Sequence, residues 1–293
     1  MLEQNANQAQ PQKKSFYNYK LFVIFSIGFL VLSIGILVNS YLTTGDFLQR
    51  GIELKGGSVI SIPASGPVDI RLVEERLSEF PQLSVRQING ISGSEISIET
   101  SSDTDPQEIL DKVKDIAQTE KASIRSVGSS LGSSFFFQVQ VGLIASFILM
   151  ATVVFVMFRS FAPSVAVILA AVSDIIETMA VMNLLGIQLT LASFAALLML
   201  VGYSVDTDML LGSRVLKGSS SIPISERIKG AFKTGMTMNI TTIAALIILF
   251  FSNLSPVLTQ IASVLIIGIV LDMINTWIQN VAIIRRYAES KGL

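Results

Sequence analysis

The sequence predicts a helical membrane protein: six transmembrane helices with one external α+β domain of ferredoxin-like (βαββαβ) order between the first two. Charged residues make up only 15% of the 293 residues and hydrophobic residues 51%, whereas soluble proteins carry about 25% charged residues. The apolar residues gather in six runs of membrane-crossing length. The polar stretch 43–134 instead alternates between strand-like and helix-like patterns.

Each apolar run is close to the roughly 20 residues that a helix needs to cross the hydrocarbon core of a bilayer. The runs cover residues 21–42, 135–158, 164–185, 188–211, 235–251 and 256–284. The first run is longer than the apolar part of a signal peptide, typically about 7–15 residues, so we interpret it as a retained helix. Residues 1–20 and 285–293 are the expected terminal tails.

Positive charges predict the orientation of these helices. If six helices alternate, the basic residues outside the external domain fall on one side of the membrane, and that side is cytoplasmic. They are Lys13, Lys14, Lys20, Arg159, Arg214, Lys217, Arg227, Lys229, Lys233, Arg285, Arg286 and Lys291. The opposite short connections, near Gly186 and at 252–255, contain no Lys or Arg. We therefore expect a multi-pass plasma (cell) membrane protein with both termini cytoplasmic and residues 43–134 external.

The external stretch predicts four strands and two helices. The strand-like segments are 58–62, 83–88, 95–99 and 123–127. One helix is expected from Pro67 and a second from Asp105-Pro106, with apolar stripes of Ile70, Val73, Leu77 and Phe80 and of Ile109, Val113 and Ile116. Asn89-Gly90 is a turn signal. The Gly/Ser-rich segment 128–134 is interpreted as a linker back to the membrane.

Composition excludes several classes of site. The chain has no histidine and no cysteine, which argues against zinc and haem centres, iron–sulfur clusters, Ser-His-Asp triads and disulfides. It also lacks a P-loop motif. A net charge of −1 gives no basic field for nucleic acid. We expect no metal, no cofactor, no nucleic-acid partner and no enzymatic activity.

Acidic residues within apolar helices are the candidate intramembrane proton or polar sites, because charge at membrane depth is expensive and usually functional. They are Asp174, Glu177, Asp206, Asp208 and Asp272. Asp174 and Glu177 share a helix face, as do Asp272, Asn275 and Gln279. Asp206 and Asp208 are two residues apart and point in nearly opposite directions, so at most one of them faces a given helix contact.

Three interpretations of these acids remain open. They could carry protons, or they could bind neighbouring polar side chains and fix helix packing, with Asn239, Thr241 and Thr242 as available partners. They could also pair with a cation from another chain, since no Lys or Arg lies within a span.

Two motifs add a family resemblance. Gly51-Ile52-Glu53-Leu54-Lys55-Gly56-Gly57 resembles the G-[ID]-[DE]-x-x-G-G signature that follows the first helix of the SecF family, the membrane subunits of the SecDF protein-export complex. Gly202-Tyr203-Ser204-Val205-Asp206 resembles the family's G-Y-S-[VI]-N-D-T stretch, and Arg214 falls where that motif has its following Arg. Taken together with the order of the predicted elements, the two motifs make the sequence resemble the archaeal branch of the SecF family, which belongs to the resistance-nodulation-division superfamily.

The resemblance implies an accessory role in the Sec pathway. Its implied partners are a SecD-like subunit, the SecYE translocon, secreted preproteins and membrane lipid, and bacterial members use the proton motive force. Two departures from the bacterial pattern bear on proton coupling. Asn-Asp-Thr is replaced by Asp206-Thr207-Asp208, and the early part of the fifth helix, 234–239, lacks the bacterial Arg.

Two other functions compete with this one. The chain could be half of a proton-driven exporter of small molecules or lipids of the resistance-nodulation-division type. An intramembrane aspartyl protease is a weaker alternative, because no Tyr-Asp or Gly-x-Gly-Asp pair occurs.

Overall fold

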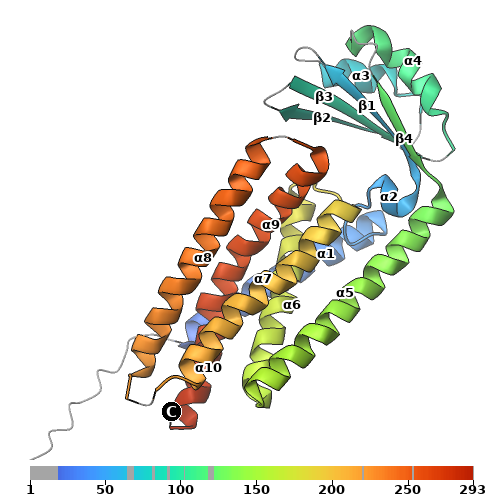
Figure 1. Cartoon of the computed structure of the whole chain (residues 1–293). Coiled ribbons are helices and arrows are strands. Elements are labelled where there is room, and N and C mark those ends of the chain that lie inside the picture. The colour runs from blue at the N-terminus through green and yellow to red at the C-terminus, as the bar shows by residue number, and fades with distance from the viewer. Residues whose placement is uncertain are drawn as a thin grey trace, which may run out of the picture.

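The computed structural model describes residues 19–64, 69–80, 83–90, 93–101, 103–117, 122–219, 221–252 and 254–292. Within these ranges, six helices are long and apolar enough to cross a membrane. A four-stranded sheet with two covering helices lies beyond one end of the helix bundle (Figure 1). The predicted fold class is thereby confirmed.

The long helices follow the order expected from the apolar runs. They are α1 (Tyr19–Thr44), α5 (Ser129–Phe158), α6 (Phe161–Leu184), α7 (Leu191–Leu216), α8 (Ile224–Ser252) and α9 (Pro256–Ile274). The chain continues from α9 through a π-helical segment, η1 (Asn275–Asn280), into α10 (Val281–Ser290). The connections α5–α6 and α7–α8 and the C-terminus lie at the end of the bundle away from the sheet (Figure 1).

Helix ends differ from the expected span boundaries where polar residues still form helix. The α8 helix begins at Ile224 rather than 235, because its polar first turns pack against the end of α7: the buried Arg227 donates from Nη1 to the Val215 carbonyl at 2.8 Å. The expected start of α7 at 188 is three residues early. Thr190 is the N-cap, and its hydroxyl accepts from the Ser193 amide in a capping box.

The expected linker 128–134 is wrong, because helix α5 already begins at Ser129. Two of its serine hydroxyls, Ser133 and Ser134, donate to the Ser130 carbonyl within the helix. Gly132 also lies so close to the backbone around Gly56 that a Cβ at this position would clash with it. The glycines and serines therefore allow a close crossing of α5 over the preceding chain.

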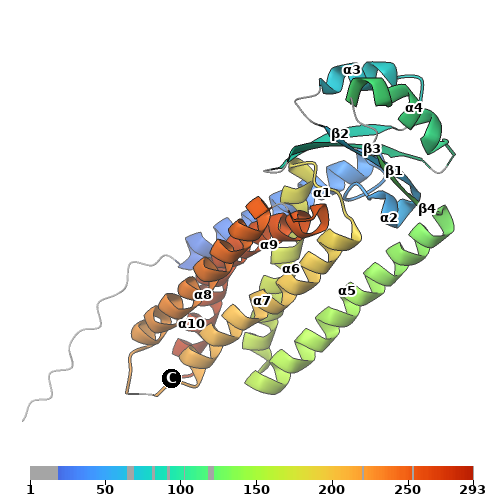
Figure 2. The same ribbon diagram turned by 45° about the horizontal axis from the view of Figure 1, so that its top comes forward.

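The external domain has the order β1 (Gly57–Ala64), α3 (Ile70–Arg76), β2 (Ser84–Gly90), β3 (Gly93–Thr100), α4 (Pro106–Ala117) and β4 (Ser123–Val127). Its sheet is antiparallel with strand order β2-β3-β1-β4, the arrangement of a ferredoxin-like βαββαβ domain. Helices α3 and α4 cover the face away from the membrane bundle (Figure 2). Between these two helices and the sheet lies an aliphatic core, which consists of Ile60, Ile62, Val73, Leu77, Ile96, Ile98, Ile109, Leu110 and Val113.

Two local predictions in this domain need comment. Asn89 and Gly90 are not the turn: both belong to β2 and pair with Ser94 and Gly93 of β3. Pro67, the expected helix start, lies outside the described residues. The described helix α3 begins at Ile70, and the Asp69 side chain caps it by accepting from the Arg71 amide at 3.0 Å.

Candidate functional site

Polar side chains from four helices meet in the interior of the membrane bundle. Helix α6 contributes Asp174 and Glu177, α7 contributes Ser204, Thr207 and Asp208, the last helix contributes Asp272, Asn275, Thr276, Gln279 and Asn280, and α1 contributes Ser26. None of these side chains is more than 7% exposed. We call this group the polar cluster.

One half of the polar cluster is organised by Asn275. Its side-chain amide donates to Asp174 Oδ1 and to Glu177 Oε2, each at 2.8 Å. Ser204 on α7 donates to the other Asp174 oxygen. Ser26 on α1 donates to Asn275 Oδ1 at 3.1 Å and to Gln279 Oε1 at 2.6 Å. Helices α1, α6, α7 and η1 are therefore joined by hydrogen bonds between buried side chains.

The other half links Asp208 and Asp272. The Thr276 hydroxyl lies 2.9 Å from Asp208 Oδ1 and 3.2 Å from Asp272 Oδ1. Thr207 donates to Asp272 Oδ2 at 3.1 Å, and the Asn280 amide donates to Asp208 Oδ1. The two carboxylates are thus bridged by one hydroxyl.

The donors of the last helix come from its π-helical segment, Asn275–Asn280. A π segment interrupts the regular backbone ladder, and such bulges are frequent at functional sites. Here the segment presents Asn275, Thr276, Gln279 and Asn280 toward α1, α6 and α7.

The polar cluster has more acceptors than donors. Glu177 Oε1, Asp208 Oδ2 and Asn280 Oδ1 are buried and have no hydrogen-bond partner. Among the residues that the structure describes, no Lys or Arg hydrogen-bonds or ion-pairs with these carboxylates. Burying ionised carboxylates without a cation is expensive.

The structure separates the other predicted residues from this cluster. Asp206 is exposed on the outer side of α7, together with Gly202 and Tyr203 of the same motif, and Arg214 is exposed in its last turn. Of the Asp206/Asp208 pair, only Asp208 faces inward.

The predicted partners on α8 do not contact the acids. Asn239 is buried, but its side-chain nitrogen has no partner, while Thr241 and Thr242 donate to carbonyls of their own helix. The donors Ser26, Thr276 and Asn280 were not singled out from the sequence. The polar run Asn275–Asn280 inside an apolar helix was the available signal for two of them.

The first motif forms a joint between the external domain and the bundle. The short helix α2 (Ile52–Lys55) carries Glu53, whose Oε2 accepts from the amide of Leu191 at the start of α7 at 2.9 Å. The Gly51 amide donates to the Leu189 carbonyl at 2.9 Å, and the Leu189 amide donates to Gln49 at 2.8 Å. Gly56 has φ 85°, a value that favours glycine. The motif acts here as a backbone connection.

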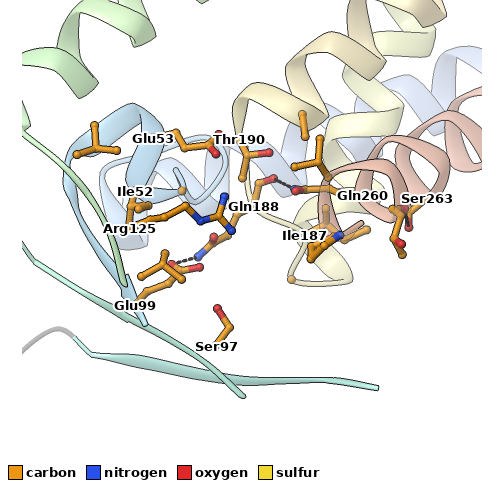
Figure 3. Close-up of a pocket in the computed structure, with 18 residues that line it drawn as sticks. Ile52, Glu53, Ser97, Glu99, Arg125, Ile187, Gln188, Thr190, Gln260 and Ser263 are labelled. Carbon is orange, nitrogen blue, oxygen red and sulfur yellow. Dashed lines mark hydrogen bonds between the residues drawn. The ribbon is translucent and has the colours of Figure 1, made fainter. Parts of the chain in front are cut away.

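A cavity of about 380 Å³ lies beside this joint, between the open face of the sheet and the bundle (Figure 3). Gln188 lies across the cavity. Its side-chain amide nitrogen donates to Glu99 Oε2 of the sheet at 2.9 Å, and its backbone carbonyl accepts from the Gln260 side chain of α9 at 3.1 Å. Arg125 of β4 also lines the cavity (Figure 3).

Comparison with known proteins decides the family. The family model for the C-terminal part of the protein-export membrane proteins SecD and SecF matches residues 107–290. The chain is 37% identical over 281 residues to the protein-export membrane protein SecF of Methanolacinia petrolearia, covering 94% of this chain and 96% of that relative. It is 35% identical to SecF of Pyrococcus furiosus, covering 92% and 90%.

The chain belongs to the SecF family of protein-export membrane proteins. The relatives are archaeal, as the motifs indicated. The SecF assignment confirms the predicted family and its protein-export function, and it replaces the exporter and protease alternatives.

A solved structure supports the fold. The crystal structure of SecDF from Thermus thermophilus, a translocon-associated membrane protein, matches with a TM-score of 0.73 and 19% identity. The match covers 93% of this SecF chain but only 38% of the SecDF chain.

Proposed function

We propose that this SecF chain is one subunit of a heteromeric membrane complex that assists the export of preproteins, and that it performs no enzymatic reaction of its own. The observation that supports this proposal is the polar cluster. Its buried acids accept hydrogen bonds from side chains of neighbouring helices, so a change at these acids would alter how α6, α7 and the η1 segment pack together. The 38% coverage of the SecDF chain supports a second, SecD-like subunit for the remainder. The SecYE channel would be the site at which the complex acts.

Within this role, the polar cluster is proposed to bind and release protons. A carboxyl oxygen without a partner can carry a proton, and Glu177 Oε1 and Asp208 Oδ2 are such atoms. Because Asn275 and Thr276 each contact two acids, a change of protonation at one acid would alter the hydrogen bonds of the next. Movement of the last helix against α6 and α7 would follow.

Conservative substitutions test proton carriage against a purely structural role. Asn keeps the shape of Asp and its hydrogen bonding but cannot carry a proton. Asp208→Asn and Asp174→Asn are expected to leave assembly intact and to abolish the part of preprotein export that depends on the proton gradient, measured in membrane vesicles with and without an ionophore. Thr241→Asn on α8 is the matched control outside the polar cluster. Unchanged gradient-dependent export in both Asp variants would leave only the structural role.

The orientation is proposed from the basic residues, with both termini in the cytoplasm and the sheet outside. Since the chain has no cysteine, single substitutions report accessibility cleanly. Gln107→Cys on α4 should react with an impermeant thiol reagent added to intact cells, and Ser221→Cys in the α7–α8 connection should react only after lysis. The reverse labelling would contradict the proposed orientation.

A further inference from the structure

The cavity between the sheet and the bundle is separate from the polar cluster, and none of the cluster's residues lines it. Its volume of about 380 Å³ lies within the range of about 300–1,000 Å³ that small-molecule sites occupy. Its walls combine apolar side chains, among them Ile52, Val59 and Ile187, with a few polar ones. This is the composition of a binding site.

The cavity lies at the boundary between hydrocarbon and water, because it is formed where the membrane spans end and the sheet begins. Its bundle wall includes Pro256 and Ser263, which lie seven residues, about 10 Å, apart along the start of α9. The surface at this end of α9 is apolar and open, since Leu254 is 76% and Val257 43% exposed. Val257 also lines the cavity. A molecule in the cavity therefore meets both the polar sheet and a surface that faces lipid.

Arg125 supplies a cation to this cavity. Its side chain is exposed and extends from β4 into the cavity (Figure 3). It makes no hydrogen bond or ion pair with the part of the chain that the structure describes. A guanidinium in this state is available to bind a phosphate through two parallel N–H···O bonds.

Two carboxylates, Glu53 and Glu99, line the same cavity. Each uses one oxygen already: Glu53 Oε2 accepts from the Leu191 amide, and Glu99 Oε2 accepts from the Gln188 side chain. Their other oxygens, Oε1, have no partner among the described residues. These atoms are free to accept hydrogen bonds from an ammonium group.

The register of the sheet holds the opposite charges apart. Val59 of β1 pairs with Glu99 on one side and with Arg125 on the other. The three side chains therefore point to one face of the sheet, and the two charged residues are two strand spacings, about 10 Å, apart. Because Glu99 and Arg125 do not neutralise each other directly, a ligand with charges of both signs fits between them.

We propose that this cavity binds the headgroup of a zwitterionic phospholipid. Arg125 holds the phosphate, Glu53 and Glu99 hold the ammonium group, and the acyl chains lie along the outer surface of α9 from Val257 onward. A purely anionic headgroup fits less well, because it would meet two carboxylates. An extended polypeptide is the less suitable occupant, because it has no use for the apolar continuation of the cavity along α9. The bound lipid would fix the external domain to the membrane surface, which goes beyond the proposed function.

Native mass spectrometry of the detergent-solubilised full chain tests the class of lipid. Titration with phosphatidylethanolamine should give one bound lipid per chain, at least fivefold more than titration with phosphatidylglycerol. Arg125→Gln should lower the bound fraction at least fivefold, and Arg125→Lys should lower it less. Arg71→Gln is the matched control, because Arg71 is exposed on α3 away from the cavity. Equal binding of the two lipids, or equal binding by Arg125→Gln and Arg71→Gln, would overturn the proposal.

A soluble competitor separates a lipid site from a site for small phosphate compounds. Glycerophosphoethanolamine carries the same headgroup without acyl chains. It should displace the bound lipid only at concentrations at least a hundredfold above that of the lipid. Displacement at equal concentration would show that the acyl chains contribute nothing, and the site would then not be a lipid site.

Photo-crosslinking in native membranes tests where the lipid binds. The photoreactive residue replaces Ser97 of β3 or Ser263 of α9, which line opposite walls of the cavity. The control position is Leu72 of α3, which is 54% exposed. Both cavity positions should give at least tenfold more lipid adduct than the control. Adducts with polypeptide in place of lipid, or lipid yields equal to that of the control, would contradict the proposal and leave the export function untouched, since neither experiment measures export.

Discussion

The interiors of the two regions of this molecule differ in polarity: the helix bundle holds the polar cluster beside an apolar core that includes Leu197, Leu200 and Leu265, whereas the core of the external domain is apolar alone. The buried residues in the core of the external domain are nine Ile, Leu and Val side chains. The centre of the membrane bundle holds four acids with Ser, Thr, Asn and Gln, while large apolar residues such as Ile148 and Ile248 lie on its outside. Each region buries the side chains that its surroundings solvate poorly. The external domain buries aliphatic side chains away from water, and the helix bundle buries polar side chains away from hydrocarbon.

The difference teaches how each interior should respond to substitution. The aliphatic core has no polar atom with which to receive a new charge. The polar cluster has excess acceptors, so its sensitive elements are the few donors that join the helices. A charge added to the first core and a donor removed from the second are therefore the informative changes.

The largest expected effect is Val73→Asp in α3. Val73 is fully buried in the aliphatic core, and an unpaired charge there costs several kcal/mol, about enough to unfold a small domain. Limited proteolysis in intact vesicles should then cleave the external domain while the helix bundle stays protected. Leu72→Asp is the matched control, since its neighbour Leu72 is 54% exposed. Equal resistance of wild type and Val73→Asp would show that the described core is wrong.

The next effect is Thr276→Val in the polar cluster. Val replaces the hydroxyl that bridges Asp208 and Asp272, and leaving buried polar groups without a partner costs about 1–3 kcal/mol. The thermal unfolding midpoint of the detergent-solubilised protein should fall by several degrees. Thr241→Val provides the comparison, because the exposed Thr241 hydroxyl contacts only its own helix. A larger fall in the control would contradict the importance of the bridge.

The contrast between the aliphatic core and the polar cluster also explains how much of each could be predicted from the sequence. The aliphatic core was predictable because apolar periodicity is local: Val73 and Leu77 lie four residues apart, and Ile96 and Ile98 two apart. The six helices were predictable from run length alone. The prediction of a turn at Asn89 was wrong, because pairing of this residue with Ser94 in the sheet overrode its local preference for a turn.

The polar cluster was only partly predictable, because hydrogen-bond partners are set by tertiary packing. The acids were visible as charges in apolar runs, and the spacing of Asp206 and Asp208 implied that they face different ways. Which of the two faces inward depends on how α7 is rotated against α6 and α9, and the expected donors on α8 were wrong for the same reason. The joint through Glu53 also depends on contact between residues 138 positions apart.

A smaller effect is expected at the joint from Glu53→Gln. The Glu53 carboxylate accepts the amide of Leu191 at the positive end of α7, and such contacts contribute roughly 0.3–1 kcal/mol. Hydrogen exchange should quicken severalfold at the Leu191 amide and stay unchanged in the interior of α7. Glu74→Gln on exposed α3 should change neither. Because the Gln amide oxygen can still accept this hydrogen bond, protection of Leu191 that survives in Glu53→Gln would show that the charge of Glu53 adds nothing to the joint.

A comparably small effect is expected from Gln188→Ala, which removes the side-chain hydrogen bond between residue 188 and the sheet. Gln188 donates to Glu99 of the sheet, while Gln260 binds the backbone of residue 188 from within the bundle. One such bond contributes about 0.5–1.5 kcal/mol, too little to detach a domain that α2 and α5 also hold. Spin labels at Glu108 on α4 and Ser252 at the end of α8 should give the same mean distance but a broader distribution. Gln260→Ala should leave the distribution narrow, because it removes no contact to the sheet. Broadening by both substitutions, or by neither, would show that Gln188 does not restrain the external domain.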